Sequence, residues 1–338
     1  MKHNFKVTGI IVLMFIISQF IGLAVVYSYD NYFGKTSQTL IANGTISNET
    51  LPDISIVREN LPPPIEIKQT VDYVSIIISI AIGITIAVLL FLFLSRVNAK
   101  LLIKIWFTFV VFLCLSIAFS LLLYPQFGLS LFNLFGKRIS LAEMIAVPLA
   151  ITFTYLKIFR RNIIAHNFSE LLIYPGLAVI FLPIVNLFLV IILLIIISVY
   201  DMIAVWKTKH MIKMAKFQVN ELKLFTGFLI PYVKREDRIK IEKIKAMKLS
   251  NKQKNQKLRK EKIHMQIAAL GGGDVAFPMI FIGVILLTLG LLPAIITIVT
   301  TAISLVLLLF FSQKGKFYPA MPFLSIGCLI GLLIGLMI

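Results

Sequence analysis

The sequence predicts an all-α, polytopic membrane protein with about nine transmembrane helices, and two observations support this class. The chain of 338 residues is 59% hydrophobic and only 14% charged, which lies outside the range of ordinary water-soluble domains. It also contains nine mainly apolar runs of about 20 residues, each long enough to cross the hydrocarbon core of a bilayer as a helix. These runs cover residues 7–27, 74–94, 105–123, 139–156, 163–181, 184–206, 265–286, 291–311 and 317–338.

Positive charge alternates between the connections. The formal net charge is +18, and the Lys and Arg residues gather before the first run and after the second, fourth, sixth and eighth. Lys157, Arg160 and Arg161 belong to the basic connection after the fourth run. Lys137 and Arg138 are an exception to the alternation, because they lie in a connection that should face the opposite side of the membrane. Because cytoplasmic loops carry an excess of Lys and Arg, we expect a multi-pass cell-membrane protein with its amino terminus in the cytoplasm and its carboxyl terminus outside. This placement also argues against a nucleic-acid partner.

The first four runs are expected to form a scaffold. Run 7–27 is longer than the apolar core of a secretory signal peptide and lacks a small-residue cleavage site after it, so it is predicted to remain as the first span. Residues 30–70 are predicted to form an outer loop without a core of its own. Glu143 lies near the outer end of the fourth run, where we expect its carboxylate to reach the headgroup region.

The stretch 163–206 must contain two spans. Its 44 residues would extend about 66 Å as one helix, about twice what a bilayer needs. Pro183 is the expected break, because proline lacks the amide donor that a helix interior requires. The fifth run opens with the polar residues His166, Asn167, Ser169 and Glu170, which we expect to lie at the membrane interface.

A basic loop, 207–264, divides the chain. It holds eighteen Lys and Arg residues against five acids, and its first half mixes apolar residues with lysines, which is typical of an amphipathic segment on anionic headgroups. Its second half is expected to be solvated. The predicted organisation is an amino-terminal bundle of six spans (1–206), this cytoplasmic loop, and a carboxy-terminal bundle of three spans (265–338).

Two acids lie within predicted spans on either side of this loop. An acid inside a membrane helix is costly and is rarely kept without a task. Asp201 is six residues before Lys207 and Asp274 is ten residues after His264, so both are expected at similar depths, roughly 9 and 15 Å from the cytoplasmic boundary. Two carboxyl groups that meet there would share one proton and titrate as a unit. That is the chemistry of aspartic proteases.

The residues near both acids fit such a site. Gly271, Gly272 and Gly273 precede Asp274 and permit another backbone to approach closely. Pro319, at the start of the ninth run, frees carbonyl groups that water or a substrate strand can use. Tyr200 offers a hydroxyl beside Asp201.

Taken in order, these segments resemble the presenilin and signal peptide peptidase family of intramembrane aspartyl proteases. Tyr200-Asp201 resembles the family's Tyr-Asp helix, Gly271-Gly-Gly-Asp274 its Gly-x-Gly-Asp motif, and Pro319-Ala-Met321 its Pro-Ala-Leu motif. The nine runs and the long loop after the sixth extend the resemblance over nearly the whole chain. Met321 replaces the usual leucine of the third motif, and Gly272 stands where the family often has leucine.

The resemblance implies a presenilin-like fold and a protease that needs no metal or cofactor. It implies that Asp201 and Asp274 are the catalytic pair and that a substrate cleft is shaped by Tyr200, Gly271, Gly272, Gly273, Pro319, Ala320 and Met321. Its substrates would be transmembrane helices or signal-peptide remnants, in the manner of a compact microbial member without accessory subunits. A homo-oligomer is left open. An unwound substrate is expected to pair as an added strand near Pro319–Met321 or the segment before Gly271.

Three alternatives stay open from the sequence. Prepilin and preflagellin peptidases also carry a Gly-x-Gly-Asp acid, but they generally have fewer spans and lack the other two segments. A proton-coupled transporter would also use intramembrane acids and broken helices, although no internal repeat relates the first four spans to the rest. A relative that has lost activity and serves as a scaffold is disfavoured because both acids are present.

Overall fold

The computed structural model describes residues 5–31, 100–128, 130–134, 137–160, 162–207, 225–233, 265–312 and 318–338, together with Ile78 and Ile82. Apart from those two positions, which are helical, the expected second span at 74–94 lies outside the described residues. So do almost all of the expected outer loop at 30–70 and the second half of the basic loop.

Seven helices in the described part of the chain are long and apolar enough to cross a membrane, which confirms the helical, multi-pass class. An eighth apolar helix, α14 (Met321–Leu336), is shorter, at 16 residues. The described residues therefore do not confirm the expected number of nine spans. In chain order these helices are α1 (Phe5–Tyr29), α5 (Lys100–Phe127), α6 (Leu141–Ile158), α7 (Ile163–Phe181), α8 (Leu187–Met202), α12 (Gly272–Leu289), α13 (Leu291–Phe311) and α14 (Met321–Leu336). Among the seven long helices, α8 is counted together with the π-helical turn that continues it, as Leu187–Lys207.

Local signals set several of the helix ends. Pro183 lies in the turn between α7 and α8 as expected, and the Asn186 side chain caps α8 by accepting a 2.9 Å hydrogen bond from the N–H of Leu189. Glu143 has a defined role at the start of α6. It accepts a 3.1 Å hydrogen bond from the N–H of Ser140 and donates its own N–H to the Ser140 hydroxyl at 3.3 Å. This capping box satisfies two orphan donors.

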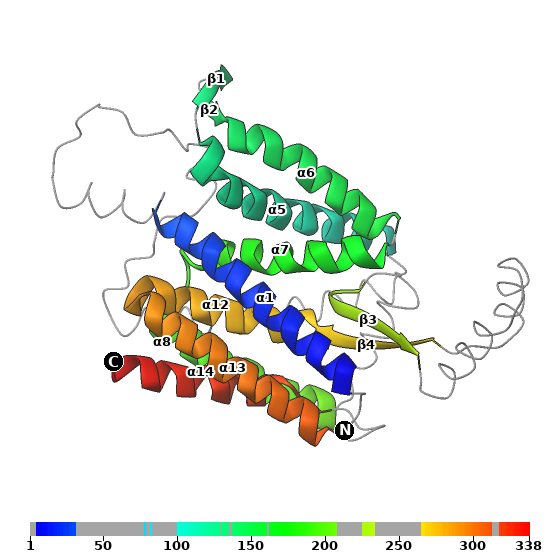
Figure 1. Ribbon diagram of the computed structural model, residues 1–338, viewed down its shortest axis with the longest axis vertical. Coiled ribbons are helices and arrows are strands. Elements are labelled where there is room, and N and C mark those ends of the chain that lie inside the picture. Colours follow the sequence, from blue (N-terminus) through cyan, green and yellow to red (C-terminus); the bar gives the residue numbers. More distant parts are fainter. Residues whose placement is uncertain are drawn as a thin grey trace, which may run out of the picture.

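Two short antiparallel sheets lie at opposite ends of the helical bundle, and neither was predicted (Figure 1). The first pairs β1 (Ser130–Leu134) with β2 (Lys137–Ser140). The second pairs β3 (Gly227–Val233) with β4 (Met265–Gly271).

The second sheet corrects two expectations. Run 265–286 is not one helix, because its first seven residues form β4 and the helix begins at Gly272. Within the expected surface segment, residues 227–233 form a strand in which Phe228 is fully buried. Glycines disfavour extending α12 backwards, and the pairing depends on two segments separated by most of the basic loop, which local patterns do not reveal.

One further expectation was wrong. Lys157 does not lie in a loop, because it is the penultimate residue of α6 and only 5% exposed. It forms an ion pair with Glu170 between α6 and α7. Glu170 belongs to the polar opening of α7, in which His166 and Ser169 are also buried within the protein; the interface position expected for this opening stays a prediction.

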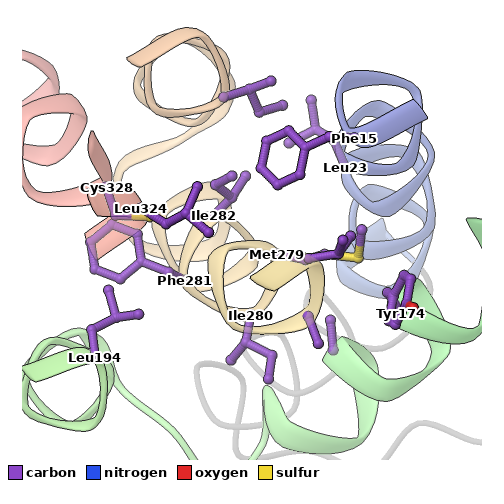
Figure 2. Packing of buried hydrophobic residues seen from close by; sticks show 14 of the residues in the cluster. Phe15, Leu23, Tyr174, Leu194, Met279, Ile280, Phe281, Ile282, Leu324 and Cys328 are labelled. Atoms are coloured by element: carbon purple, nitrogen blue, oxygen red, sulfur yellow. The ribbon is translucent and has the colours of Figure 1, made fainter. Parts of the chain in front are cut away.

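Helix α12 forms the centre of the core. Figure 2 shows Met279 directed toward α1 and toward Tyr174 of α7, and Phe281 on the side of α8 and α14. Every residue from 278 to 286 of α12 is buried. A helix that is apolar and buried on all sides is expected only in the interior of a bundle.

Small residues allow the neighbouring helices to approach closely. Gly327, Gly331 and Gly335 are spaced four apart along α14 and face α13. A Cβ atom on Gly335 would lie 2.7 Å from the Cβ of Pro293, and one on Gly327 would lie 2.5 Å from the Ser304 hydroxyl oxygen. Such small-residue repeats are typical of helix contacts within membranes, where close packing replaces the hydrophobic driving force.

Candidate active site

Asp201 lies in the last turn of α8 and is buried. Its Oδ2 accepts a 3.1 Å hydrogen bond from the backbone N–H of Met321, and the N–H of Ala320 also donates to this carboxyl group. The helix continues after Asp201 as a π-helical turn, Ile203–Lys207. Such turns are rare and are frequent at functional sites.

Asp274 is the third residue of α12 and is partly exposed. The N–H of Gly271, the last residue of β4, donates to its carboxylate. A Cβ atom on Gly271 would lie 3.1 Å from Oδ2 of Asp274, so a side chain at this position would press on the carboxylate. Gly273 is exposed, whereas Gly272 is buried.

The structure brings the two acids together. Helices α8 and α12 pack against each other, and the carboxyl groups of Asp201 and Asp274 interact electrostatically. Each carboxyl group also receives backbone N–H donors from a neighbouring segment, 320–321 for Asp201 and Gly271 for Asp274. The three segments that the sequence singled out therefore converge at one place.

The expected cleft residues differ in exposure. Pro319 and Met321 are buried and Ala320 is partly exposed. Tyr200 is 40% exposed on the surface of α8 and interacts electrostatically with its neighbour Asp201.

Several residues near the acids were not predicted. The hydroxyl groups of Ser198 on α8 and Ser325 on α14 are 2.7 Å apart and join these helices near Asp201. Gln19 of α1 is fully buried and its Nε2 donates to the carbonyl oxygen of Val275 at 3.1 Å. A glutamine in an otherwise apolar run is the signal that could have identified Gln19, because buried amides require partners.

One edge of β3 is occupied by side chains from α7. Asn167 Nδ2 donates to the carbonyl oxygen of Leu229 at 2.8 Å, and the N–H of Leu229 donates back to Asn167 Oδ1 at 3.0 Å. His166 Nε2 lies 2.9 Å from the carbonyl oxygen of Gly227. The start of α7 therefore fixes the sheet that leads into Asp274.

Within the ranges that the structure describes, no three His, Cys, Asp or Glu side chains are grouped so that they could hold a metal ion. The arrangement is a pair of interacting carboxyl groups held by backbone donors. Two such groups can supply one general base and one general acid.

A family model described as signal-peptide peptidase, presenilin aspartyl protease matches residues 66–338. The chain belongs to this family of aspartyl proteases. None of the curated proteins searched matches the sequence. The family match favours this assignment over the prepilin-peptidase and transporter alternatives.

Solved structures of presenilin-family intramembrane aspartate proteases resemble this family member over nearly their whole length. A structure in a C222 crystal form aligns with a TM-score of 0.56 and 18% identity, covering 98% of each chain. One in a P2 crystal form aligns with a TM-score of 0.55 and 20% identity, covering 97% of this chain and 96% of that one. This likeness confirms the presenilin-like fold.

Proposed function

We propose that this protein is an intramembrane aspartic endopeptidase in which Asp201 and Asp274 form the catalytic dyad. The observation that carries the assignment of these residues is the approach of two carboxyl groups from adjacent membrane helices, each held by backbone N–H donors. No other pair of acidic side chains in the described residues combines this approach with the family's motif positions.

The dyad can perform amide hydrolysis without a cofactor. Two carboxyl groups that share one proton provide a carboxylate and a carboxylic acid at the same time. The carboxylate takes a proton from water as the water oxygen attacks the carbonyl carbon, and the acid protonates the carbonyl oxygen. Collapse of the tetrahedral intermediate breaks the C–N bond and passes a proton to the leaving nitrogen. The N–H donors of Met321 and Gly271 fix the two carboxyl groups during these steps.

A membrane-spanning substrate must expose its amide groups before it can be cleaved. We propose that the unwound segment adds as a strand to β4. Leu229 lies opposite Ala269 in the sheet, and both backbone polar groups of Leu229 are turned toward Asn167. This is therefore a non-hydrogen-bonded pair, and the N–H and C=O of Ala269 point away from β3. Ala269 is exposed, so its backbone groups are suited to receive another strand.

Strand addition at β4 would guide the substrate toward the dyad. Gly271 follows Ala269 by two residues and its N–H is engaged by Asp274. A substrate strand aligned on Ala269 would therefore lead its next peptide groups toward the carboxylates. The substrates implied are transmembrane helices, with signal-peptide remnants as one source.

The charge pattern supports an orientation with the β3–β4 end of the bundle in the cytoplasm. The carboxyl end of α14 and the amino end of α1 lie at opposite ends of the bundle (Figure 1). Arg160 lies between α6 and α7, at the end where α7 contacts β3. Since basic connections face the cytoplasm, we place this end of the bundle on the cytoplasmic side. The basic loop would then lie on the same side, where its lysines and arginines can bind anionic headgroups.

The test uses the full chain reconstituted in liposomes with a labelled single-span helix as substrate. We expect fragments whose new ends map within the apolar segment, and in H₂¹⁸O we expect one ¹⁸O in the new carboxylate. Asp201→Asn and Asp274→Asn each remove the proton exchange while keeping the side-chain shape, and each should bring cleavage below detection.

Glu143→Gln is the matched control, because Glu143 is also an acid in an apolar helix but caps α6 instead. It should cleave at the wild-type rate. Cleavage that persists in both Asp→Asn variants would remove these residues from the mechanism.

A further inference from the structure

A cluster of polar side chains is buried between α6 and α7, outside the three family segments. Lys157 Nζ pairs with Oε1 of Glu170, and their side chains are 2% and 1% exposed. Oε2 of the same carboxylate accepts the hydroxyl of Tyr174, one turn further along α7. His166 Nε2 lies 3.8 Å from Oε1 of Glu170. Charged groups within membrane helices are costly and are rarely kept without a task.

Tyr174 connects this cluster to the start of α12. Its hydroxyl oxygen lies 3.0 Å from the point that a Cβ atom on Gly272 would occupy. Its ring meets Phe228 of β3 edge to face, with the ring centroids 5.9 Å apart. The hydroxyl also interacts electrostatically with Asp274. Tyr174 therefore fills, from α7, the space that a side chain at position 272 would require.

The first turn of α12 lacks two of the hydrogen bonds that usually stabilise the start of a helix. Gly271, at the N-cap, provides no side-chain hydrogen bond to the helix. Pro278 removes the N–H that would otherwise bond to the carbonyl of Asp274. The backbone around Asp274 therefore depends on contacts from neighbouring elements, and Tyr174 of α7 and Gln19 of α1 supply two of them.

We propose that Tyr174 is a positioning residue for Asp274, and that Glu170 and Lys157 hold Tyr174 in place. The contact with Lys157 fixes the Glu170 side chain, which accepts the Tyr174 hydroxyl and holds it against Gly272. This proposal rests on the proposed function, because it assigns Tyr174 a part in the same reaction.

The first test is Tyr174→Phe, which keeps the ring and its contact with Phe228 and removes only the hydroxyl. The expected result is a fall in kcat of about 10- to 100-fold, the scale of a small misplacement of a catalytic group, with KM within about twofold of wild type. Tyr155→Phe is the matched control, since Tyr155 is 52% exposed on α6, and it should leave kcat unchanged.

A second variant separates positioning from stability. A buried ion pair can often be replaced by apolar residues of similar size without loss of stability, whereas a single change leaves one charge unpaired. The double variant Lys157→Met, Glu170→Leu should therefore remain folded and still show the reduced kcat of Tyr174→Phe. Adding Tyr174→Phe to it should lower kcat no further, because all three changes break one chain of contacts.

Hydrogen exchange gives a readout that needs no activity. Backbone amides of residues 268–276 should exchange faster in Tyr174→Phe than in wild type, while those of α13 stay unchanged. If the wild-type protein cleaves nothing, the proposed function fails, and this measurement still decides the positioning role. Wild-type kcat with wild-type exchange in Tyr174→Phe would overturn the proposal. So would a loss of activity that follows only a fall in the melting temperature, without local change at 268–276.

Discussion

The backbone N–H of Met321 donates a 3.1 Å hydrogen bond to Oδ2 of Asp201, a residue 120 positions earlier in the chain. The contact uses the backbone at position 321 and not its side chain. It therefore explains how methionine can stand where the family usually has leucine, because either residue supplies the same donor.

This contact predicts opposite effects for two conservative changes. Asp201→Glu should reduce cleavage by about 100-fold or more, because the added methylene moves the carboxyl group away from the Met321 N–H and from Asp274. Met321→Leu should keep the rate within about threefold of wild type, since the donor remains and the volume is similar. Initial rates per mole of folded protein in liposomes measure both. Equal losses in the two variants would show that the side chain at 321, and not its N–H, sets the site.

The side chain of Asn167 is predicted to protect β3. Asn167→Leu removes two hydrogen bonds to Leu229 and leaves its N–H and C=O without these partners. We expect a loss of about 1–3 kcal/mol of stability and faster hydrogen exchange at Leu229.

Asn162→Leu serves as the comparison for Asn167→Leu, because Asn162 is exposed and its side chain caps α7 by accepting a hydrogen bond from the N–H of Ile164. Its effect on exchange should be confined to the start of α7. An unchanged exchange rate at Leu229 in the Asn167 variant would contradict the prediction.

The hydrogen bond between Ser198 and Ser325 is predicted to join α8 to α14. Hydrogen bonds between membrane helices contribute about 0.6 kcal/mol on average, so Ser198→Ala and Ser325→Ala should each destabilise the protein by about that amount. The double variant should lose no more than either single variant, because both remove one 2.7 Å contact. Ser116→Ala is the control, since Ser116 bonds within its own helix, to Phe112. Additive losses, measured by thermal unfolding, would rule out the coupling.

Gly176 is predicted to be intolerant of any side chain. A Cβ atom there would overlap the backbone carbonyl of Cys114 on α5, and a backbone cannot move aside as a flexible side chain does. Gly176→Ala should therefore lower stability by about 1–3 kcal/mol by forcing α5 and α7 apart. Gly9→Ala, with nothing within 4 Å of its Cβ position, should have no such effect. A stable Gly176→Ala protein would mean that these helices pack less closely.

The helical part of the fold was open to prediction because membrane helices are specified locally. Lipid offers no hydrogen-bond partners, so an apolar run of sufficient length must form a helix, and Pro183 ends one where its missing N–H requires it. Asp201 and Asp274 are predicted as site residues for a related reason, because an acid within an apolar run is costly and rarely kept without a task.

The position of Lys157 shows where sequence reasoning reached its limit. A lysine at the end of an apolar run can lie in a loop, or it can lie in the helix and pair with a buried acid. Only the packing of α6 on α7 brings Glu170 to it. In the same way, the sequence predicts a helix where β4 forms, because the strand that pairs with it, β3, lies within the basic loop.

Local composition and short motifs are enough to predict that this chain enters the membrane as helices and carries two acids in family-specific segments. The surroundings of those acids follow from the packed fold: the backbone donors at 320–321, the β3–β4 sheet, and Tyr174 against Gly272. These contacts join residues far apart in the chain, and they exist only because the packed helices bring buried polar groups to the partners that lipid cannot provide.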